Sequence, residues 1–150
     1  EATYFHPQDN WEDTAGALSA SISMDYVFKG NLYVMGGLLF SSLGADSTVN
    51  FSALANSAIV STTPPSAKFL MPAKYSALLS ISKPITPLIN GSLVAIYSPG
   101  VNLLFVMPSL SLAVANNWDF SVFAQTSMLD NGVNFRNYGT SVFARLKWGF

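Results

Sequence analysis

Apolar and polar residues alternate along most of this chain. From Leu18 to Phe28, one parity is entirely apolar, whereas the other is mainly serine. A period of two is typical of β-strands, whose successive side chains point to opposite faces of a sheet. Seven segments follow this pattern closely enough to predict antiparallel strands: Leu18–Phe28, Leu32–Phe40, Leu70–Ser82, Ile89–Ser98, Val101–Val114, Trp118–Met128 and Tyr138–Phe150.

The connections between these segments fall into two sizes, and both are rich in Gly, Pro, Asn and Asp. The short ones are Lys29–Asn31, Lys83–Leu88, Ser98–Gly100 and Ala115–Asn117. The long ones are Ser41–Lys68 and Leu129–Asn137, and residues 1–14 also have the composition of a loop. The sequence therefore predicts one all-β segment over residues 1–150, with an external loop at 1–14 and a meander of about seven strands at 15–150.

Two local features complicate the predicted strands. Pro108 has no backbone N–H to donate to a sheet, so we expect a bulge or a local break there. Thr3–Phe5 is apolar enough for a strand but too short to count as one. An odd number of strands would place the two ends of the meander on opposite sides, so we expect the remaining strands to come from sequence before Glu1 or from another chain.

The amino-acid composition favours a sheet that faces lipid over a sheet of a soluble protein. Half of the residues are apolar and 10% are charged, whereas soluble domains average about 25% charged residues. No apolar run approaches the roughly 18 residues that a membrane-spanning helix needs. Because only helices and closed barrels satisfy all backbone groups in lipid, the composition favours an antiparallel transmembrane β-barrel, with this chain as part of a larger one.

In such a barrel, one parity of each strand faces lipid and the other faces the lumen. We expect the following side chains to face lipid: Leu110, Leu112, Val122, Ala124, Val142 and Leu146. We expect the following to face the lumen: Asp25, Lys74, Asp119, Gln125, Arg145 and Lys147.

Aromatic residues gather where strands meet the predicted short turns. They are Tyr26, Phe28, Trp118, Phe120, Trp148 and Phe150. A meander brings these positions to one rim, as in the aromatic girdle of a membrane protein. The alternative is that they are ordinary strand aromatics, which are common in any sheet.

The segment Val142–Phe150 ends in an aromatic residue preceded by apolar residues at two-residue steps. It resembles the C-terminal insertion signal of Gram-negative outer-membrane β-barrels, with Leu146, Trp148 and Phe150 at the matching positions. The resemblance implies a bacterial outer-membrane location and recognition by the barrel-insertion machinery. The segments 5–13 and 84–91 also resemble the C-terminal third of larger porin-like proteins, which implies no known active site.

Residues suited to catalysis or metal binding are sparse. The chain has no cysteine, and its one histidine, His6, lies in a predicted loop. The nearby acidic residues Asp9, Glu12 and Asp13 do not match the spacing of a calcium-binding loop. A net charge of −1 without a basic patch argues against a nucleic-acid partner. We therefore predict no enzyme activity, no cofactor and no metal site.

The function that this sequence favours is a porin-like diffusion channel for small solutes in the lipid bilayer of an outer membrane. Arg145 and Lys147 would bias such a pore toward anions, unless they pair with a carboxylate such as Asp119. The alternative is a structural or assembly subunit of an outer-membrane complex with no open pore. A membrane enzyme is disfavoured, because His6 is the only histidine available.

Overall fold

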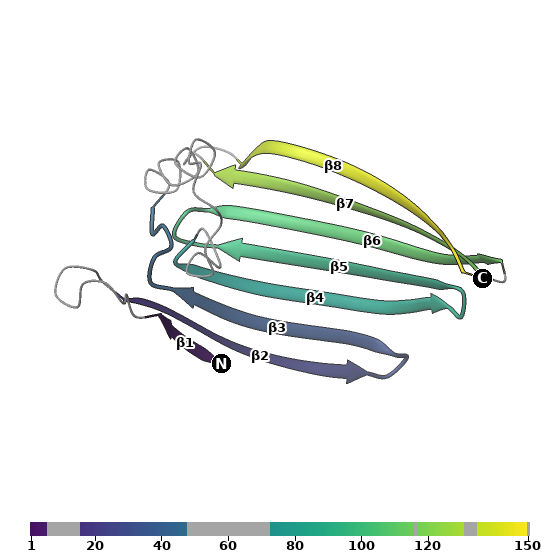
Figure 1. Ribbon diagram of the computed structural model, residues 1–150, viewed down its shortest axis with the longest axis horizontal. Helices are drawn as coiled ribbons and strands as arrows, with labels where there is room; N and C mark the ends of the chain where they lie inside the picture. Colours follow the sequence, from purple (N-terminus) through teal and green to yellow (C-terminus); the bar gives the residue numbers. More distant parts are fainter. Residues whose placement is uncertain (6–15, 48–72, 116, 131–134, 150) are drawn as a thin grey trace.

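The computed structural model describes residues 1–5, 16–47, 73–115, 117–130 and 135–149. These residues form one eight-stranded antiparallel sheet whose strands lie side by side in chain order (Figure 1). No helix occurs among them. The strands are β1 (Ala2–Phe5), β2 (Ala17–Phe28), β3 (Leu32–Ser41), β4 (Tyr75–Thr86), β5 (Ile89–Ser98), β6 (Leu103–Ala115), β7 (Trp118–Asp130) and β8 (Phe135–Trp148).

The sheet has two distinct ends. The connections β2–β3, β4–β5 and β6–β7 lie at one end, which we call the short-turn end (Figure 1). The ends of β1, β3, β5 and β7 and the starts of β2, β4, β6 and β8 lie at the other, which we call the loop end. At the β2–β3 turn, Gly30 and Asn31 have φ angles of 81° and 60°. Gly and Asn tolerate this left-handed conformation better than other residues, which is why the turn is this tight.

One strand was missed in the sequence. Residues 2–5 lie within the predicted N-terminal loop, and Thr3–Phe5 is too short for the sequence to predict a strand, yet Ala2–Phe5 forms β1. β1 pairs with residues 17–20 of β2. The pairing is extended by two backbone hydrogen bonds between Glu1 and Ser21, of 2.8 and 2.9 Å. The count is therefore eight rather than seven, and β1 and β8 run in opposite directions.

Several of the predicted boundaries between strands and loops are shifted in the structure. The predicted turn Lys83–Leu88 is mostly strand, because β4 continues to Thr86 through a bulge at Ile85. The predicted loop Leu129–Asn137 is also largely strand, since β7 reaches Asp130 and β8 begins at Phe135. Residues 70–72 of the predicted strand Leu70–Ser82 lie outside the described residues, as do residues 48–68 of the predicted loop Ser41–Lys68 and residues 6–14 of the predicted N-terminal loop.

Pro108 interrupts pairing on one side only. In β5–β6 it pairs with Leu93, but the β6–β7 ladder skips Met107 and Pro108 and resumes in the same register. The expected local break is therefore confirmed and the bulge is not. Bulges lie instead near strand ends, at Ile85, Val114 and Tyr138. Such extra residues increase the local twist and bending of a strand.

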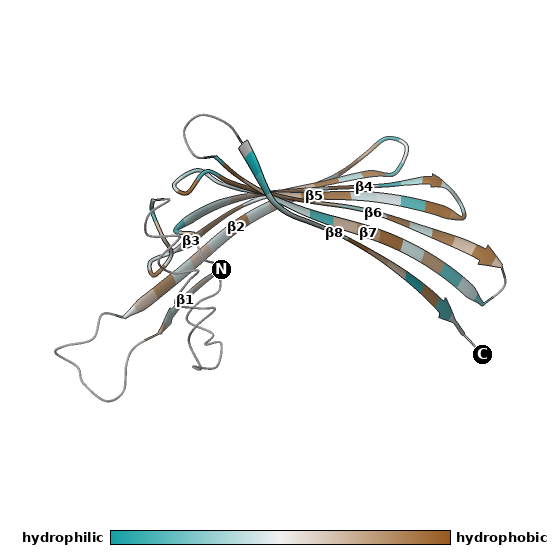
Figure 2. Cartoon of the chain, turned by 90° about the horizontal axis from the view of Figure 1, so that it is seen from above, coloured by the Kyte–Doolittle hydropathy of each residue, from teal (hydrophilic) through white to brown (hydrophobic). Residues whose placement is uncertain are grey.

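The sheet is twisted, arched and open (Figure 2). Within the described part of the chain, β8 pairs with β7 alone, and β1 pairs with β2 alone. β1 covers only the first part of β2, so the backbone from Ile22 to Phe28 has a partner strand on one side only. The antiparallel all-β prediction is confirmed, and the sheet has the form of a partial barrel.

The one buried apolar cluster among the described residues lies at the loop end and not on the sheet. Ala45, Ala73 and Val101 pack together there, and Leu103 lies against them. Ala45 and Ala73 form an isolated parallel bridge, and the Lys74 N–H donates to the Ala45 carbonyl at 2.8 Å. We call this cluster the clasp, since it joins the segment after β3 to the segment before β4.

Candidate functional site

One face of the sheet is apolar over most of its height. Residues directly paired across antiparallel strands share a face, so the registers define which side chains lie together. β2 contributes six apolar side chains to this face, one at every second position from Leu18 at the loop end to Phe28 at the short-turn end. On this apolar face, the polar strand residues lie near strand ends: Lys83, Thr86, Thr126, Asp130, Asn137 and Thr140.

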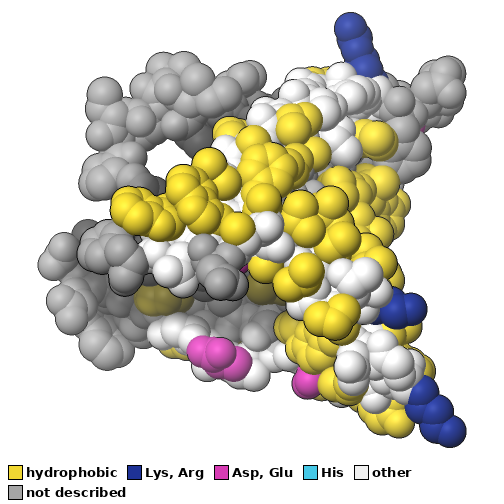
Figure 3. Space-filling model, turned by 90° about the vertical axis from the view of Figure 1, so that its right-hand side faces the viewer, with side chains coloured by type: hydrophobic (Ala, Val, Ile, Leu, Met, Phe, Trp, Pro, Cys, Tyr) yellow, Lys and Arg dark blue, Asp and Glu magenta, His cyan; other side chains and the backbone are white. Residues whose placement is uncertain are grey.

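The apolar face is exposed rather than covered. Ile22, Met24 and Val142 have 71%, 80% and 67% of their surface accessible. Figure 3, which views the short-turn end, shows apolar side chains across the surface and Lys and Arg at its margins. An apolar surface this large requires a nonaqueous environment or a partner.

Aromatic side chains lie at both ends of the apolar face and are absent between them in the described strands. Near the short-turn end are Tyr26, Phe28, Trp118, Phe120 and Trp148. Near the loop end are Tyr4, Phe40, Tyr75 and Tyr97. The sequence predicted the first group, of which Phe150 lies outside the described residues. The second group was missed, because its members come from separate strands and only the register aligns them.

The aliphatic band between the two aromatic groups is built from small and branched side chains. Paired examples are Ile22 with Leu38, and Leu110 with Val122. Gly36 also lies on this face, and a Cβ added there would meet no atom within 4 Å. The six residues predicted to face lipid lie on this apolar face: Leu110, Leu112, Val122, Ala124, Val142 and Leu146.

The opposite face, which we call the serine-rich face, combines hydroxyl groups with apolar patches. Two serine pairs bridge neighbouring strands, Ser76 with Ser98 at 2.8 Å and Ser92 with Ser109 at 2.6 Å. Its apolar side chains include Leu78, Ile96 and Phe105, which are neighbours across β4, β5 and β6. These side chains are half-buried, because the sheet arches over this face.

Phe123 and Phe143 form an aromatic pair on the serine-rich face. They are directly paired between β7 and β8, with ring centroids 4.9 Å apart and planes inclined by 18°. Phe123 and Phe143 remain 40% and 45% exposed. The pair therefore offers a flat apolar surface on a face that is otherwise rich in hydroxyls.

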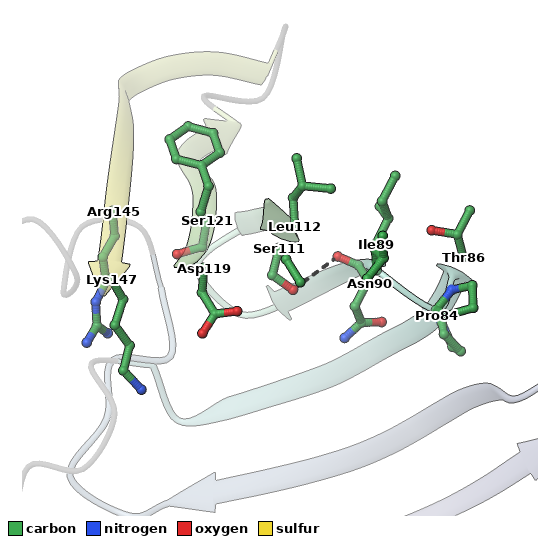
Figure 4. Close-up of a pocket in the computed structure, with 14 residues that line it drawn as sticks. Pro84, Thr86, Ile89, Asn90, Ser111, Leu112, Asp119, Ser121, Arg145 and Lys147 are labelled. Atoms are coloured by element: carbon green, nitrogen blue, oxygen red, sulfur yellow. Dashed lines mark hydrogen bonds between the residues drawn. The ribbon is translucent and has the colours of Figure 1, made fainter. Parts of the chain in front are cut away.

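A groove of about 420 Å³ lies on the same face, toward the short-turn end (Figure 4). Phe123 and Phe143 do not line it, but Ser121 and Arg145, two residues along the same strands, do. Arg145, Lys147 and Asp119 line it and extend to the same side of the sheet, whereas Leu112 points to the other side. Asn90 completes the polar lining, and its backbone carbonyl accepts a hydrogen bond from the Ser111 hydroxyl at 3.4 Å. The groove thus carries two cations and one carboxylate.

The register places these charges in a specific order. Asp119 is directly opposite Lys147, and Ser121 is directly opposite Arg145. Opposite charges that face each other across an antiparallel pair attract. Lys147 therefore has a carboxylate as its cross-strand neighbour, whereas Arg145 has a hydroxyl.

The remaining residues predicted to face the lumen are dispersed. Gln125 pairs with Ser141 on the serine-rich face, nearer the loop end than the groove. Asp25 lies on the same face but on β2, five strands away from β7. Lys74 lies just before β4, outside the ladder that would fix its face. Sequence reasoning did not identify the Phe123–Phe143 pair, although each residue is apolar on the face of its strand that is otherwise mostly polar.

Residues suited to other chemistry are absent from the part of the chain that can be described. No group of three or more His, Cys, Asp or Glu side chains could hold a metal ion there. No helix in that part is long and apolar enough to cross a membrane. His6, Asp9, Glu12 and Asp13 lie outside the described residues.

The fold and its two faces define a class: an antiparallel β-meander with one apolar face bordered by aromatic residues and one hydroxyl-rich face. Comparison with protein-family models, with curated protein sequences and with solved structures finds no match. The argument about function therefore rests on the chain's own residues.

Proposed function

We propose that this chain is a membrane-spanning part of a bacterial outer-membrane β-barrel, with the apolar face toward lipid. The observation that carries the proposal is the apolar face itself, with aromatic side chains at both ends and aliphatic ones between. Outer-membrane barrels have an outward-facing apolar band about 25 Å tall, flanked by aromatic girdles at both interfaces. A soluble barrel would place its apolar side chains inside and its polar ones outside.

The height of the band supports this assignment. β2 spans ten residue steps from Leu18 to Phe28, or about 33 Å along the strand. A strand tilted by roughly 40°, as in outer-membrane barrels, would then cover about 25 Å of bilayer. The polar residues of the apolar face also lie at its edges, where headgroups and water would meet them.

The activity we propose is passive diffusion of small solutes along the serine-rich face, as in a porin. Serine side chains are small and hydrogen-bond both to water and to each other, so they line a water-filled path without blocking it. The open edges at β1 and β8 would be paired in the complete barrel, either with further polypeptide, including a second copy of the chain, or with each other. Large side chains on this face, such as Phe105 and Met107, favour a second candidate, a narrow barrel filled by its own side chains. That candidate is a structural or assembly subunit without a pore.

The experiment is to fold the full chain into lipid vesicles and planar bilayers. We expect strand-type circular dichroism, protection of the strands from protease, and stepwise conductance. Protection without conductance would support the filled barrel over the pore. A chain that stays outside the bilayer and remains protease-sensitive would refute the membrane assignment.

A further inference from the structure

The serine-rich face carries an amphipathic arrangement beside the groove. On β8, Phe143, Arg145 and Lys147 occupy successive positions of one face. On β7, Phe123 lies opposite Phe143, and Ser121 lies opposite Arg145. Successive positions on one face are about 6.6 Å apart along a strand. An aromatic surface therefore passes directly into a cationic one, with Arg145 at the boundary.

We propose that this surface binds an aromatic carboxylate, with the ring on Phe143 and Phe123 and the carboxylate on Arg145. The proposal rests on the proposed function, because it needs the serine-rich face to border water within the membrane. Aromatic rings prefer offset stacking or edge contacts with other rings. An Arg guanidinium presents parallel donors that match the two oxygens of a carboxylate.

The positive charge beside the aromatic pair favours an aromatic anion over a neutral or cationic aromatic ligand. Lys147 has the Asp119 carboxylate directly opposite it, whereas Arg145 has the Ser121 hydroxyl. Because opposite charges attract across an antiparallel pair, the register favours Asp119 as the partner of Lys147 and leaves Arg145 as the cation for a bound anion. Ser121, directly opposite Arg145, also lines the groove and supplies a further polar contact for the carboxylate (Figure 4).

The groove has room for the charged end of such a ligand. Its volume of about 420 Å³ lies at the small end of ligand pockets, which run from about 300 to 1,000 Å³. The carboxylate and its water would lie in the groove beside Arg145, and the ring would lie on the Phe123–Phe143 pair next to the groove. A long acyl chain would extend beyond the aromatic pair onto neighbouring strands.

The test is a titration of 4-fluorobenzoate against the full chain in lipid nanodiscs, followed by fluorine NMR, with empty nanodiscs to correct for partitioning into lipid. We expect saturable binding. 4-Fluorobenzyl alcohol, which lacks the charge, and trifluoroacetate, which lacks the ring, should each bind about tenfold more weakly.

Matched variants separate the site from general effects. Arg145→Gln should weaken 4-fluorobenzoate binding about tenfold, whereas Arg136→Gln removes the same charge from the loop end of the same strand and should leave it unchanged. Phe143→Leu should weaken binding, whereas Phe105→Leu, elsewhere on the same face, should not. Asp119→Asn should strengthen binding, because it removes the carboxylate that faces Lys147.

The outcomes distinguish this inference from the proposed function. If the chain inserts and conducts but Arg145→Gln and Arg136→Gln bind 4-fluorobenzoate equally, the binding site is refuted and the channel stands. If Arg145→Gln fails to fold, Arg145→Lys keeps the charge without the paired donors and should still weaken binding. A chain that does not insert into lipid refutes both, since the serine-rich face would then have no lumen to border.

Discussion

Trp118 and Trp148 face each other across β7 and β8 at the short-turn end of the apolar face, with ring centroids 5.9 Å apart and planes inclined by 20°. The two residues begin one strand and end the next, so a single interaction closes this end of the hairpin. Trp is favoured at the level of lipid headgroups, where its ring is in the apolar layer and its N–H reaches water. The pair joins the two strands at this end, and with the membrane assignment proposed above it would also lie at the bilayer edge.

The contact between the two tryptophans should stabilise the folded protein by more than the burial of each ring alone would. A double-mutant cycle of Trp118→Ala and Trp148→Ala in lipid vesicles should give a coupling of about 0.5 to 1.5 kcal/mol in the free energy of unfolding. Phe123→Ala with Trp148→Ala, which joins residues on opposite faces, is the control and should show no coupling. Additive effects in both cycles would mean that the stacking contributes nothing.

A charge on the apolar face should destabilise the protein in lipid. Val122 lies near the middle of β7 and is paired with Leu110 and Ala144. Val122→Arg should lower the free energy of unfolding by about 2 to 4 kcal/mol in lipid vesicles, as for an Arg at the bilayer midplane.

The matched control for this substitution is Gln125→Arg, which places the same side chain on the same strand but on the serine-rich face. It should change the unfolding free energy by far less, because the guanidinium would remain in water. Denaturant titrations monitored by tryptophan fluorescence measure both values. Equal losses for the two variants would contradict the assignment of the faces.

The β2–β3 turn should depend on glycine for backbone reasons alone. Gly30 has a φ of 81°, whereas Gly36 does not have a positive φ, and an added Cβ meets nothing within 4 Å at either position. Gly30→Ala should therefore destabilise the protein by about 1 kcal/mol. Gly36→Ala should be neutral or stabilising, since alanine restricts the unfolded chain and adds apolar surface in a strand. Unfolding transitions of the two variants compare the effects directly, and an equal loss would show that the conformation of Gly30 is not responsible.

The alternation of apolar and polar residues predicted the strands well where it continues without interruption along the whole strand. β2 and β5 match their predicted ranges within a residue at each end, because the alternation of apolar and polar residues stops at the turn residues beside them. The ends of β4 and β8 could not be predicted, because a bulge lets a strand continue after its parity has shifted. β1 was missed because four residues carry too little pattern, and its pairing with β2 is a tertiary contact.

The candidate site was predicted in part. The sequence placed Asp119, Arg145 and Lys147 on one face, and the register then showed which charges oppose each other. The aromatic pair Phe123 and Phe143 had no signal of its own, since two phenylalanines twenty residues apart become neighbours only through the β7–β8 register. The aromatic residues near the loop end were missed for the same reason.

The clasp has a consequence for how the protein can be altered. It holds Ala45 beside Ala73, so the ends of the intervening stretch are fixed by the clasp and not by the length of that stretch. Closing a longer excursion between fixed ends requires only about 0.6 kcal/mol for each doubling in length. A foreign peptide inserted between these two alanines would therefore leave every hairpin register intact. With the outer-membrane location proposed above and the loop end outside the cell, an epitope inserted here would be displayed on the cell surface.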